Sequence, residues 1–236
     1  VIAGTPETWA LTVEATDKLG LKASVQVNIE TTNANDPPTV TAATFSIAEN
    51  SATGTRIDTV TASDVDVGDK LTFSITAGNS QDIFAIDPSS GELQVKQPLL
   101  NFEEKSQHEL TVTATDDGTP ARSGTATVTV DVTDVNEAPV VPPQTFTVDE
   151  NEPQGTPVGI IVASDVDNDK LTYAIVDPPR IAGEDVFKLD GNTIQVGAAA
   201  PLSFEKTPSY NLKIKVVDDG TPTLDVETTM VIGLNN

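Results

Sequence analysis

The sequence has no cysteine and few basic residues, and these absences exclude several classes of protein. Without cysteine, neither a disulfide framework nor a thiolate metal site is available. Only 13 lysine and arginine residues stand against 36 aspartate and glutamate residues, and the formal net charge of -23 repels nucleic-acid phosphates and anionic membrane surfaces. No apolar run approaches the roughly 20 residues of a membrane-spanning helix. We therefore expect no nucleic-acid partner and no direct insertion of this segment into a membrane.

Further absences bear on where the protein works. No Asn-x-Ser/Thr sequence occurs, which favours a bacterial-type surface protein over a glycosylated animal one. No signal peptide is evident at Val1-Ile2-Ala3-Gly4, so we expect any export signal or anchor to lie outside this segment. A surface protein without disulfides needs another source of rigidity, and bound calcium can provide it.

The chain repeats itself at intervals of about one hundred residues. Residues 62–75, ASDVDVGDKLTFSI, match residues 163–175, ASDVDNDKLTYAI, and residues 101–120 match residues 203–222. An earlier stretch, WALTVEATD at 9–17, matches HELTVTATD within the first of these repeats. This period is too long for a solenoid repeat and is typical of whole domains in series.

Within a repeat the local pattern predicts β-strands. Residues 110–114 and 126–132 alternate apolar with polar side chains, and β-branched residues dominate both runs. Residues 87–91 and 190–192 are rich in Asp, Gly, Pro, Ser and Asn and separate short apolar runs, so both are predicted turns. Short strands at regular spacing, with no helical period, predict an all-β fold of tandem antiparallel β-sandwiches with about seven strands each.

The repeats also predict the domain boundaries. Asn33-Ala34-Asn35-Asp36-Pro37-Pro38 aligns with Asp134-Val135-Asn136-Glu137-Ala138-Pro139, and we interpret both as linkers. Residues 37–136 and 137–236 are then complete repeats, whereas residues 1–36 hold the last two strands and linker of a preceding one. Two strands cannot bury a core by themselves. Either the chain is an excerpt from a longer array, or another polypeptide completes the first segment by strand addition.

Carboxylates gather in short motifs around these linkers. The first full repeat contains Glu49-Asn50 and Asn101-Phe102-Glu103, and the second linker lies at its end. The second repeat contains Asp165-Val166-Asp167 and Asp218-Asp219-Gly220. In an extended stretch the two aspartates of Asp-x-Asp lie on one side, so both can reach the same ion or two adjacent ions. Calcium binds six to eight oxygen ligands in flexible geometry, and these motifs offer carboxylates and backbone carbonyls.

These motifs, in this order, resemble the calcium-binding repeats of the cadherin family. The resemblance covers essentially the whole chain and implies immunoglobulin-like, Greek-key, seven-stranded sandwiches of the cadherin type, with up to three calcium ions at each junction between repeats. At the second linker it implies calcium ligands from the side chains of Glu49, Glu103, Asp134, Asn136, Glu137, Asp165, Asp167 and Asp218, and from the carbonyls of Val135, Ala138 and Asn168. At the first linker it implies Asn35, Asp36, Asp64, Asp66 and Asp116.

This sequence departs from the family pattern at three of these places. Asn101 and Glu137 each replace a usual aspartate, so we expect two or three ions at the second linker. Asn33 replaces the leading aspartate of the first linker, where we expect at most one ion. Four further acidic or amide residues face junctions whose other halves are not in this sequence, so we expect no full site there. They are Asp17, Glu150, Glu205 and Asn236.

Other interpretations of the same residues fit the sequence poorly. An EF-hand loop starting at Asp165 would need glycine and glutamate where Lys170 and Val176 stand. A glycosidase uses one pair of acids, whereas these acids recur once per repeat, so we expect no enzyme. The single histidine, His108, aligns with Trp9 and Tyr210, which predicts a half-buried strand position.

The resemblance implies a function in adhesion outside the cell. We expect a segment of a secreted or cell-surface adhesin, in which calcium stiffens a rod of repeats for homophilic or other cell and surface adhesion. Its partners would be calcium, neighbouring repeats of the parent chain, and a protein or glycan on a cell surface. Two alternatives are a calcium-dependent carbohydrate-binding module, although only 4% of residues are aromatic, and a filament subunit completed by a donated strand.

Overall fold

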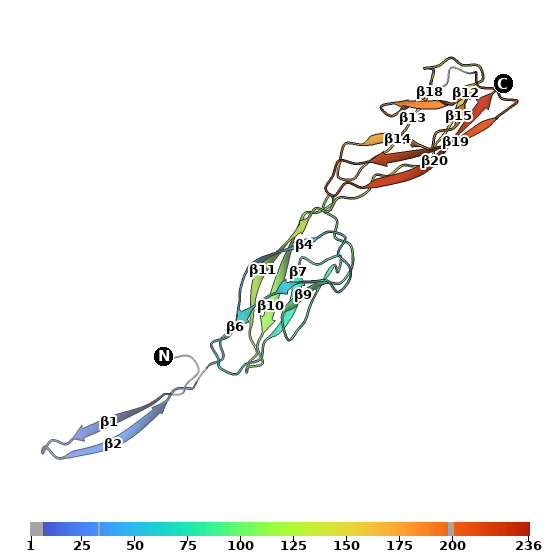
Figure 1. Ribbon diagram of the computed structural model, residues 1–236. Helices are drawn as coiled ribbons and strands as arrows, with labels where there is room; N and C mark the ends of the chain where they lie inside the picture. Colours follow the sequence, from blue (N-terminus) through green and yellow to red (C-terminus); the bar gives the residue numbers. More distant parts are fainter. Residues whose placement is uncertain (1–6, 33, 198–200) are drawn as a thin grey trace. The chain divides into compact units, whose positions relative to one another are not determined.

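The computed structural model describes residues 7–32, 34–197 and 201–236, which form an all-β protein (Figure 1). Residues 1–6 and Asn33, which belong to the predicted first segment and its linker, lie outside the described residues. The chain divides into two units, Val1–Asp134 and Val135–Asn236. The described residues include no helix that is long and apolar enough to cross a bilayer.

The first unit begins with a β-hairpin made of β1 (Thr8–Thr16) and β2 (Lys22–Glu30). The two strands pair antiparallel over nine residues, from Thr8 opposite Glu30 to Thr16 opposite Lys22. Asp17 closes the turn, because its carboxylate accepts the N–H groups of Leu19 and Leu21 at 2.8 and 2.9 Å. Every residue of both strands is exposed.

The rest of the first unit is a β-sandwich of a four-stranded and a three-stranded sheet. The larger sheet has the order β4-β11-β10-β7, and the smaller has the order β5-β9-β8. Two short strands pair beside them as β3 with β6. The bounds are β3 (Thr39–Val40), β4 (Ala43–Ala48), β5 (Arg56–Thr59), β6 (Ala62–Ser63), β7 (Thr72–Ala77), β8 (Phe84–Ile86), β9 (Glu92–Val95), β10 (Gln107–Thr115) and β11 (Ser123–Thr133).

The second unit repeats this architecture. Its larger sheet has the order β12-β20-β19-β14 and its smaller sheet the order β13-β18-β17, while a small extra hairpin pairs β15 with β16. A single bridge between Val140 and Ser164 takes the place of β3 and β6. The bounds are β12 (Thr145–Asp149), β13 (Pro157–Ile160), β14 (Thr172–Val176), β15 (Arg180–Ile181), β16 (Glu184–Asp185), β17 (Phe187–Asp190), β18 (Thr193–Val196), β19 (Ser209–Val217) and β20 (Asp225–Asn235).

The expectation of seven-stranded sandwiches is confirmed, but the expectation that they are purely antiparallel is wrong in one detail. In each sandwich the first strand of the larger sheet, β4 or β12, pairs parallel with the last strand, β11 or β20. The first strand leads into β5 or β13 of the opposite sheet, so it does not turn back on a sequential neighbour. Alternation of apolar and polar residues predicts a strand and its buried face, and it carries no information about the direction of the partner.

Each core lies between the two sheets of its own sandwich. In the first, Leu110, Val112, Val128 and Val130 of the larger sheet belong to the same buried cluster as Leu93 of the smaller one. In the second, the matching residues are Leu212, Ile214, Met230, Ile232 and Ile194. Burying each of these side chains contributes roughly 1.5–3 kcal/mol. The two cores are built separately, so each holds the loops at the ends of its own sandwich in place.

Candidate metal centres

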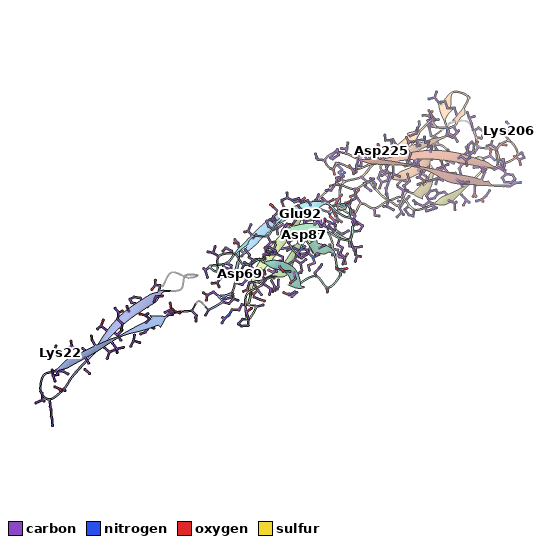
Figure 2. All side chains as sticks on the ribbon, turned by 90° about the horizontal axis from the view of Figure 1, so that it is seen from below. Lys22, Asp69, Asp87, Glu92, Lys206 and Asp225 are labelled. Atoms are coloured by element: carbon purple, nitrogen blue, oxygen red, sulfur yellow. The ribbon has the colours of Figure 1, made fainter. Side chains whose placement is uncertain are left out.

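Three aspartates meet in the loops at one end of the first sandwich. One carboxylate oxygen from each of Asp64, Asp69 and Asp116 lies within 4.8 Å of the others. Asp64 follows β6 directly, and Asp116 follows β10 directly, so two strand ends carry two of the three side chains. Asp69 comes from the loop between β6 and β7 and is labelled in Figure 2. The sequence predicted Asp64 and Asp116 as ligands but not Asp69.

The first linker is tied to these loops by hydrogen bonds. The Asn35 side-chain amide donates to Asp116 Oδ1 at 3.1 Å and to the Pro120 carbonyl at 2.9 Å. The Asp36 N–H donates to Asp66 Oδ2 at 2.6 Å, and the Asp66 N–H donates to Asp64 Oδ1 at 2.9 Å. The predicted set Asn35, Asp36, Asp64, Asp66 and Asp116 therefore lies together in one unit.

Asp116 is the most firmly held of these acids. Its side chain is buried, with 4% exposed, and Oδ1 accepts the N–H groups of Gly118 and Arg122 at 3.1 and 2.9 Å. Burial alone would raise its pKa, but the hydrogen bonds from Arg122, Asn35 and Gly118 outweigh burial and lower the pKa below its usual value. Gly118 allows the close approach, because a Cβ there would collide with the side-chain amide of Asn35. Asp116 is thus held as a buried anion.

The second unit builds the corresponding loops in the same way. One carboxylate oxygen from each of Asp165, Asp167 and Asp169 lies within 4.8 Å of the others. The Glu137 N–H donates to Asp167 Oδ2 at 2.8 Å, and the Asp167 N–H donates to Asp165 Oδ1 at 3.0 Å. Linker residue Glu137 thus belongs to this unit, as Asp36 belongs to the first.

Asp218 and Asn136 complete the resemblance between the two units. Asn136 donates to Asp218 Oδ2 at 3.1 Å and to the Pro222 carbonyl at 2.8 Å. Buried Asp218 accepts the N–H groups of Gly220 and Leu224 at 3.2 and 2.8 Å. The predicted ligands Asn136, Glu137, Asp165, Asp167 and Asp218 are all joined in this network.

Several buried carboxylate oxygens in these loops have no hydrogen-bond partner among the described residues. They are Asp64 Oδ2, Asp69 Oδ2 and Asp116 Oδ2 in the first unit, and Asp165 Oδ2 and Asp167 Oδ1 in the second. A buried anion without a partner is costly, and the neighbouring carboxylates increase the cost by repulsion. A donor set made of carboxylate and amide oxygens suits a hard divalent cation, and such a cation would satisfy these oxygens.

The repulsion is evident in the pKa values of Asp69 and Asp169. Burial raises the pKa of Asp69, and the charges of Asp117, Asp64, Asp66 and Asp116 raise it further. Burial likewise raises the pKa of Asp169, followed by the charges of Asp219, Asp165, Asp218 and Asp167. A bound cation would supply the positive charge that balances these acids.

A third cluster lies at the other end of the first sandwich. One carboxylate oxygen from each of Glu49, Glu103 and Asp134 lies within 4.8 Å of the others. Buried Glu49 follows β4 and accepts the Phe102 N–H at 2.9 Å, while Asp134 follows β11. The second sandwich repeats the contact, because Glu150 accepts the Phe204 N–H at 3.1 Å. The structure thus brings together Glu49, Glu103 and Asp134, and their role as calcium ligands stays a prediction.

Comparison with known proteins identifies the repeats. The family model described as Cadherin domain matches residues 43–133 and 144–235. The chain belongs to the cadherin family. This confirms the family and the fold class inferred from the sequence. Cadherins are extracellular or cell-surface adhesion proteins without catalytic activity. This agrees with the location expected from the sequence and with the expectation that the chain is not an enzyme.

The most similar relatives include very long cadherins. Human Protocadherin-23 is 35% identical over 227 residues, a match that covers 93% of this chain and 7% of that protein. Mouse Cadherin EGF LAG seven-pass G-type receptor 2 is 36% identical over 241 residues, covering 97% of this chain and 8% of that protein. The chain thus spans less than a tenth of the length of these relatives.

Solved cadherin structures share the fold over nearly the whole chain. Repeats EC22–24 of mouse Cadherin-23 have a TM-score of 0.67 at 27% identity, covering 95% of this chain and 73% of that one. Repeats EC1–3 of Protocadherin Gamma C5 have a TM-score of 0.65 at 28% identity, covering 96% and 77%.

The remaining ligand predictions for the cadherin repeats concern backbone carbonyls. Val135, Ala138 and Asn168 are exposed, and Asn168 takes a positive φ of 64°. Their role as carbonyl ligands stays a prediction.

Two ligand candidates, Asp69 and Asp169, were missed by sequence reasoning. Each is the third acid of its loop and precedes the sequence Lys-Leu-Thr, and this alignment could have drawn attention to them.

Proposed function

We propose that this chain is a segment of an adhesion protein in which calcium bound at the ends of tandem cadherin repeats stiffens the array. Residues 37–136 and 137–236 are the two complete repeats in this proposal. Residues 1–36 are the final strands and linker of an earlier repeat. The whole protein would act at the cell surface on a protein or glycan partner.

The observation that carries the calcium proposal is the set of buried carboxylate oxygens without partners in the described parts of both repeats. Asp64, Asp69 and Asp116 share one loop cluster, and the same positions are acidic in the second repeat. Calcium at extracellular modules commonly binds with dissociation constants on the order of 0.1–1 mM, so extracellular concentrations would fill such sites. Each site filled at one hundred times its dissociation constant adds about 2.7 kcal/mol to the stability of the bound form.

The second linker supports a role for calcium in joining repeats. Asp134 clusters with Glu49 and Glu103 of the first unit, whereas Asn136 and Glu137 bond to the second unit. The four residues from Asp134 to Glu137 thus include candidate ligands that belong to each of the two units. We propose that these ligands share cations and thereby restrict rotation about the linker.

The hairpin supports the assignment of residues 1–36. Its strands β1 and β2 have the pairing of β10 and β11, and Leu11 and Val13 align with Leu110 and Val112. In the complete repeat these positions are buried in the core between the two sheets. The apolar face of the hairpin is the face that a complete repeat would cover.

Small-angle X-ray scattering of the full chain tests the stiffening. We expect a longer and less variable particle in millimolar calcium than in EDTA. The variant carrying Asp165→Asn and Asp167→Asn should lose most of this difference. A control with Asp177→Asn and Asp190→Asn removes the same charge from positions of the same unit outside the acid clusters and should behave as wild type. Identical wild-type profiles with and without calcium would refute the proposal.

A further inference from the structure

The second sandwich exposes four apolar side chains at positions where the first sandwich has threonine. Val140, Ile160 and Val162 are 63%, 59% and 59% exposed, and Pro142 is exposed as well; we call these four residues the apolar patch. The alignment that places Asp64 at Asp165 places a threonine of the first sandwich at each of the four positions. They are Thr39, Thr41, Thr59 and Thr61. The two sandwiches thus differ at this surface in their affinity for water.

The four side chains of the apolar patch lie on one face of a short ladder beside β13. Val140 pairs with Ser164 through backbone hydrogen bonds of 2.8 and 3.0 Å. Ile160 and Val162 alternate with Ser164 along one segment, so all three point to the same side. Pro142 follows Val140 at the same spacing on the other segment. The residues between them pack into or against the core, so the patch faces outward.

A side chain holds this ladder together where a backbone hydrogen bond is missing. In the first sandwich the Thr41 N–H donates to the Thr61 carbonyl at 2.9 Å, a bond that Pro142 cannot make. Gln144 replaces it, because its side-chain amide donates to the Val162 carbonyl and accepts the Val162 N–H, both at 2.8 Å. The patch is therefore fixed in place. Pro142 is followed by a second proline, so this segment offers no N–H to an added strand, and a partner docks on the side chains.

The surroundings of the patch favour a second copy of this chain as its partner. Residues 138–148 and 153–164 contain no charged residue, although the net charge of the chain is -23. A basic partner would bind the acid clusters instead of this uncharged surface, and an anionic membrane repels the chain. A two-fold contact places the patch against itself, so that apolar side chains meet without bringing patch acids together.

The size of the patch sets the strength of such a contact. Two copies of four partly exposed side chains would remove several hundred square ångströms from water, whereas a stable interface buries about 1,200–2,000 Å². The contact is therefore weak between single chains. Repetition along neighbouring arrays would strengthen it by avidity.

We propose that the apolar patch is a self-association surface, through which the second repeats of two chains pair about a two-fold axis. The proposal rests on the proposed adhesion function in that it specifies one protein partner, a second copy. None of the four residues belongs to the acid clusters, so the pairing needs no cation of its own.

Disulfide crosslinking of the full chain locates the contact. The sequence has no cysteine, so one introduced thiol reports on one position. Single cysteines replace Val140, Ile160 or Val162, and Thr61→Cys serves as the control at an equivalent exposed position of the first sandwich. A disulfide needs Cβ atoms about 3.5–4.5 Å apart, so under mild oxidation at least one patch cysteine should form covalent dimers several times faster than Thr61→Cys. If none of the three does, the proposal is wrong.

Sedimentation equilibrium from about 10 μM to 1 mM measures the strength of the contact. The parent chain for this series carries Leu11→Thr and Val27→Thr, which remove the apolar face of the exposed hairpin as a competing contact. Adding Val140→Thr, Ile160→Thr and Val162→Thr copies the first sandwich into the second. We expect these exchanges to weaken dimerisation by about tenfold or more.

Val231→Thr provides the matched control, because Val231 is 41% exposed on β20 outside the patch, and this variant should associate like its parent. Added sodium chloride should strengthen the association by screening the repulsion between two acidic chains. A parent that stays monomeric at the highest concentration, or a patch variant that associates like its parent, would overturn the proposal. Neither result affects the stiffening by calcium, which scattering measures on the dilute chain. Identical scattering with and without calcium would in turn remove the stiffening and leave the dimer in place.

Discussion

The hairpin β1–β2 and the strand pair β10–β11 have nearly the same sequence pattern but very different surroundings. Both pair antiparallel over nine residues, and Leu11 and Leu110 occupy equivalent positions. Leu110 is fully buried, whereas 52% of Leu11 is exposed. Local alternation is therefore enough to define a strand pair and its register, while burial requires the second sheet that β5, β8 and β9 provide.

This contrast separates two contributions to stability. Strand pairing alone exchanges hydrogen bonds with water for hydrogen bonds within the protein, a net gain of roughly 0.5–1.5 kcal/mol each. A two-stranded hairpin is therefore marginal by itself. Burial of the face that carries Leu110, Val112, Val128 and Val130 adds roughly 1.5–3 kcal/mol for each side chain, a contribution that the exposed hairpin lacks.

Replacing Leu110 by alanine should have the largest effect on stability. It leaves a cavity in the core of the first sandwich and should lower the free energy of unfolding of that sandwich by about 2–5 kcal/mol. Leu11→Ala, at the equivalent exposed position, should change it by less than about 0.5 kcal/mol. Urea denaturation in constant calcium measures both.

Leu212→Ala serves as the matched change in the second sandwich, where Leu212 is equally buried. It should lower the stability of that sandwich by a similar amount. A comparable loss from Leu11→Ala would mean that the hairpin face is covered in solution, and the hairpin would then not differ from the strand pair β10–β11 in burial.

The aspartates that follow these strands differ in the same way. Asp17 follows β1 and caps an exposed turn, whereas buried Asp116 follows β10 and lies among carboxylates. Asp116→Asn should reduce the calcium-dependent rise in melting temperature, because it removes a charged ligand from the first cluster. Asp17→Asn should leave that rise unchanged. Thermal unfolding in EDTA and in millimolar calcium compares the two variants, and an unchanged calcium response of Asp116→Asn would contradict its role as a ligand.

Much of the fold could be predicted from the sequence because it depends on local or repeated patterns. Alternating runs such as residues 110–114 predicted strands, and residues 87–91 predicted the turn between β8 and β9. Asp87 holds that turn by accepting the N–H and hydroxyl groups of Ser89 and Ser90, which lower its pKa to about 2. Such turns depend on neighbouring residues only. The parallel pairing of β4 with β11 joins distant segments, and no local pattern encodes it.

The candidate metal site was predicted in part for a related reason. Acids carried by the family motifs, such as Asp64 and Asp116, could be assigned by alignment. Asp69 and Asp169 lie outside the motifs used for that assignment. The shared Lys-Leu-Thr after each could have drawn attention to them, but their approach to the clusters depends on positive-φ turns at Gly68 and Asn168 in loops of different length. Acids that are far apart in the sequence, such as those of the cluster at the other end of the first sandwich, meet only because the fold brings them together.

His108 was predicted to be half-buried because it aligns with Trp9 and Tyr210, but it is buried, with 4% exposed. Its ring packs edge-on against Phe84 with centroids 5.2 Å apart, and Tyr210 packs against Phe187 in the same way at 5.4 Å. The smaller imidazole fits wholly beneath the sheet, whereas the larger phenol reaches further toward water. Trp9, in the hairpin, is 59% exposed.

The smallest effect we expect is a pH dependence that only the first sandwich shows. Burial, followed by the charge of Lys105, lowers the pKa of His108 from its ordinary value of 6.5. His108 of the unfolded chain thus binds a proton at a higher pH than His108 of the folded chain. Above about pH 6.5 the buried neutral imidazole therefore costs no stability, and as the pH falls below 6.5 protonation of the unfolded chain lowers the free energy of unfolding. His108→Tyr installs the residue of the second sandwich and should remove this dependence. Urea denaturation at several values between about pH 8 and pH 5.5 measures it. Parallel pH profiles for wild type and variant would show that the buried imidazole carries no such penalty.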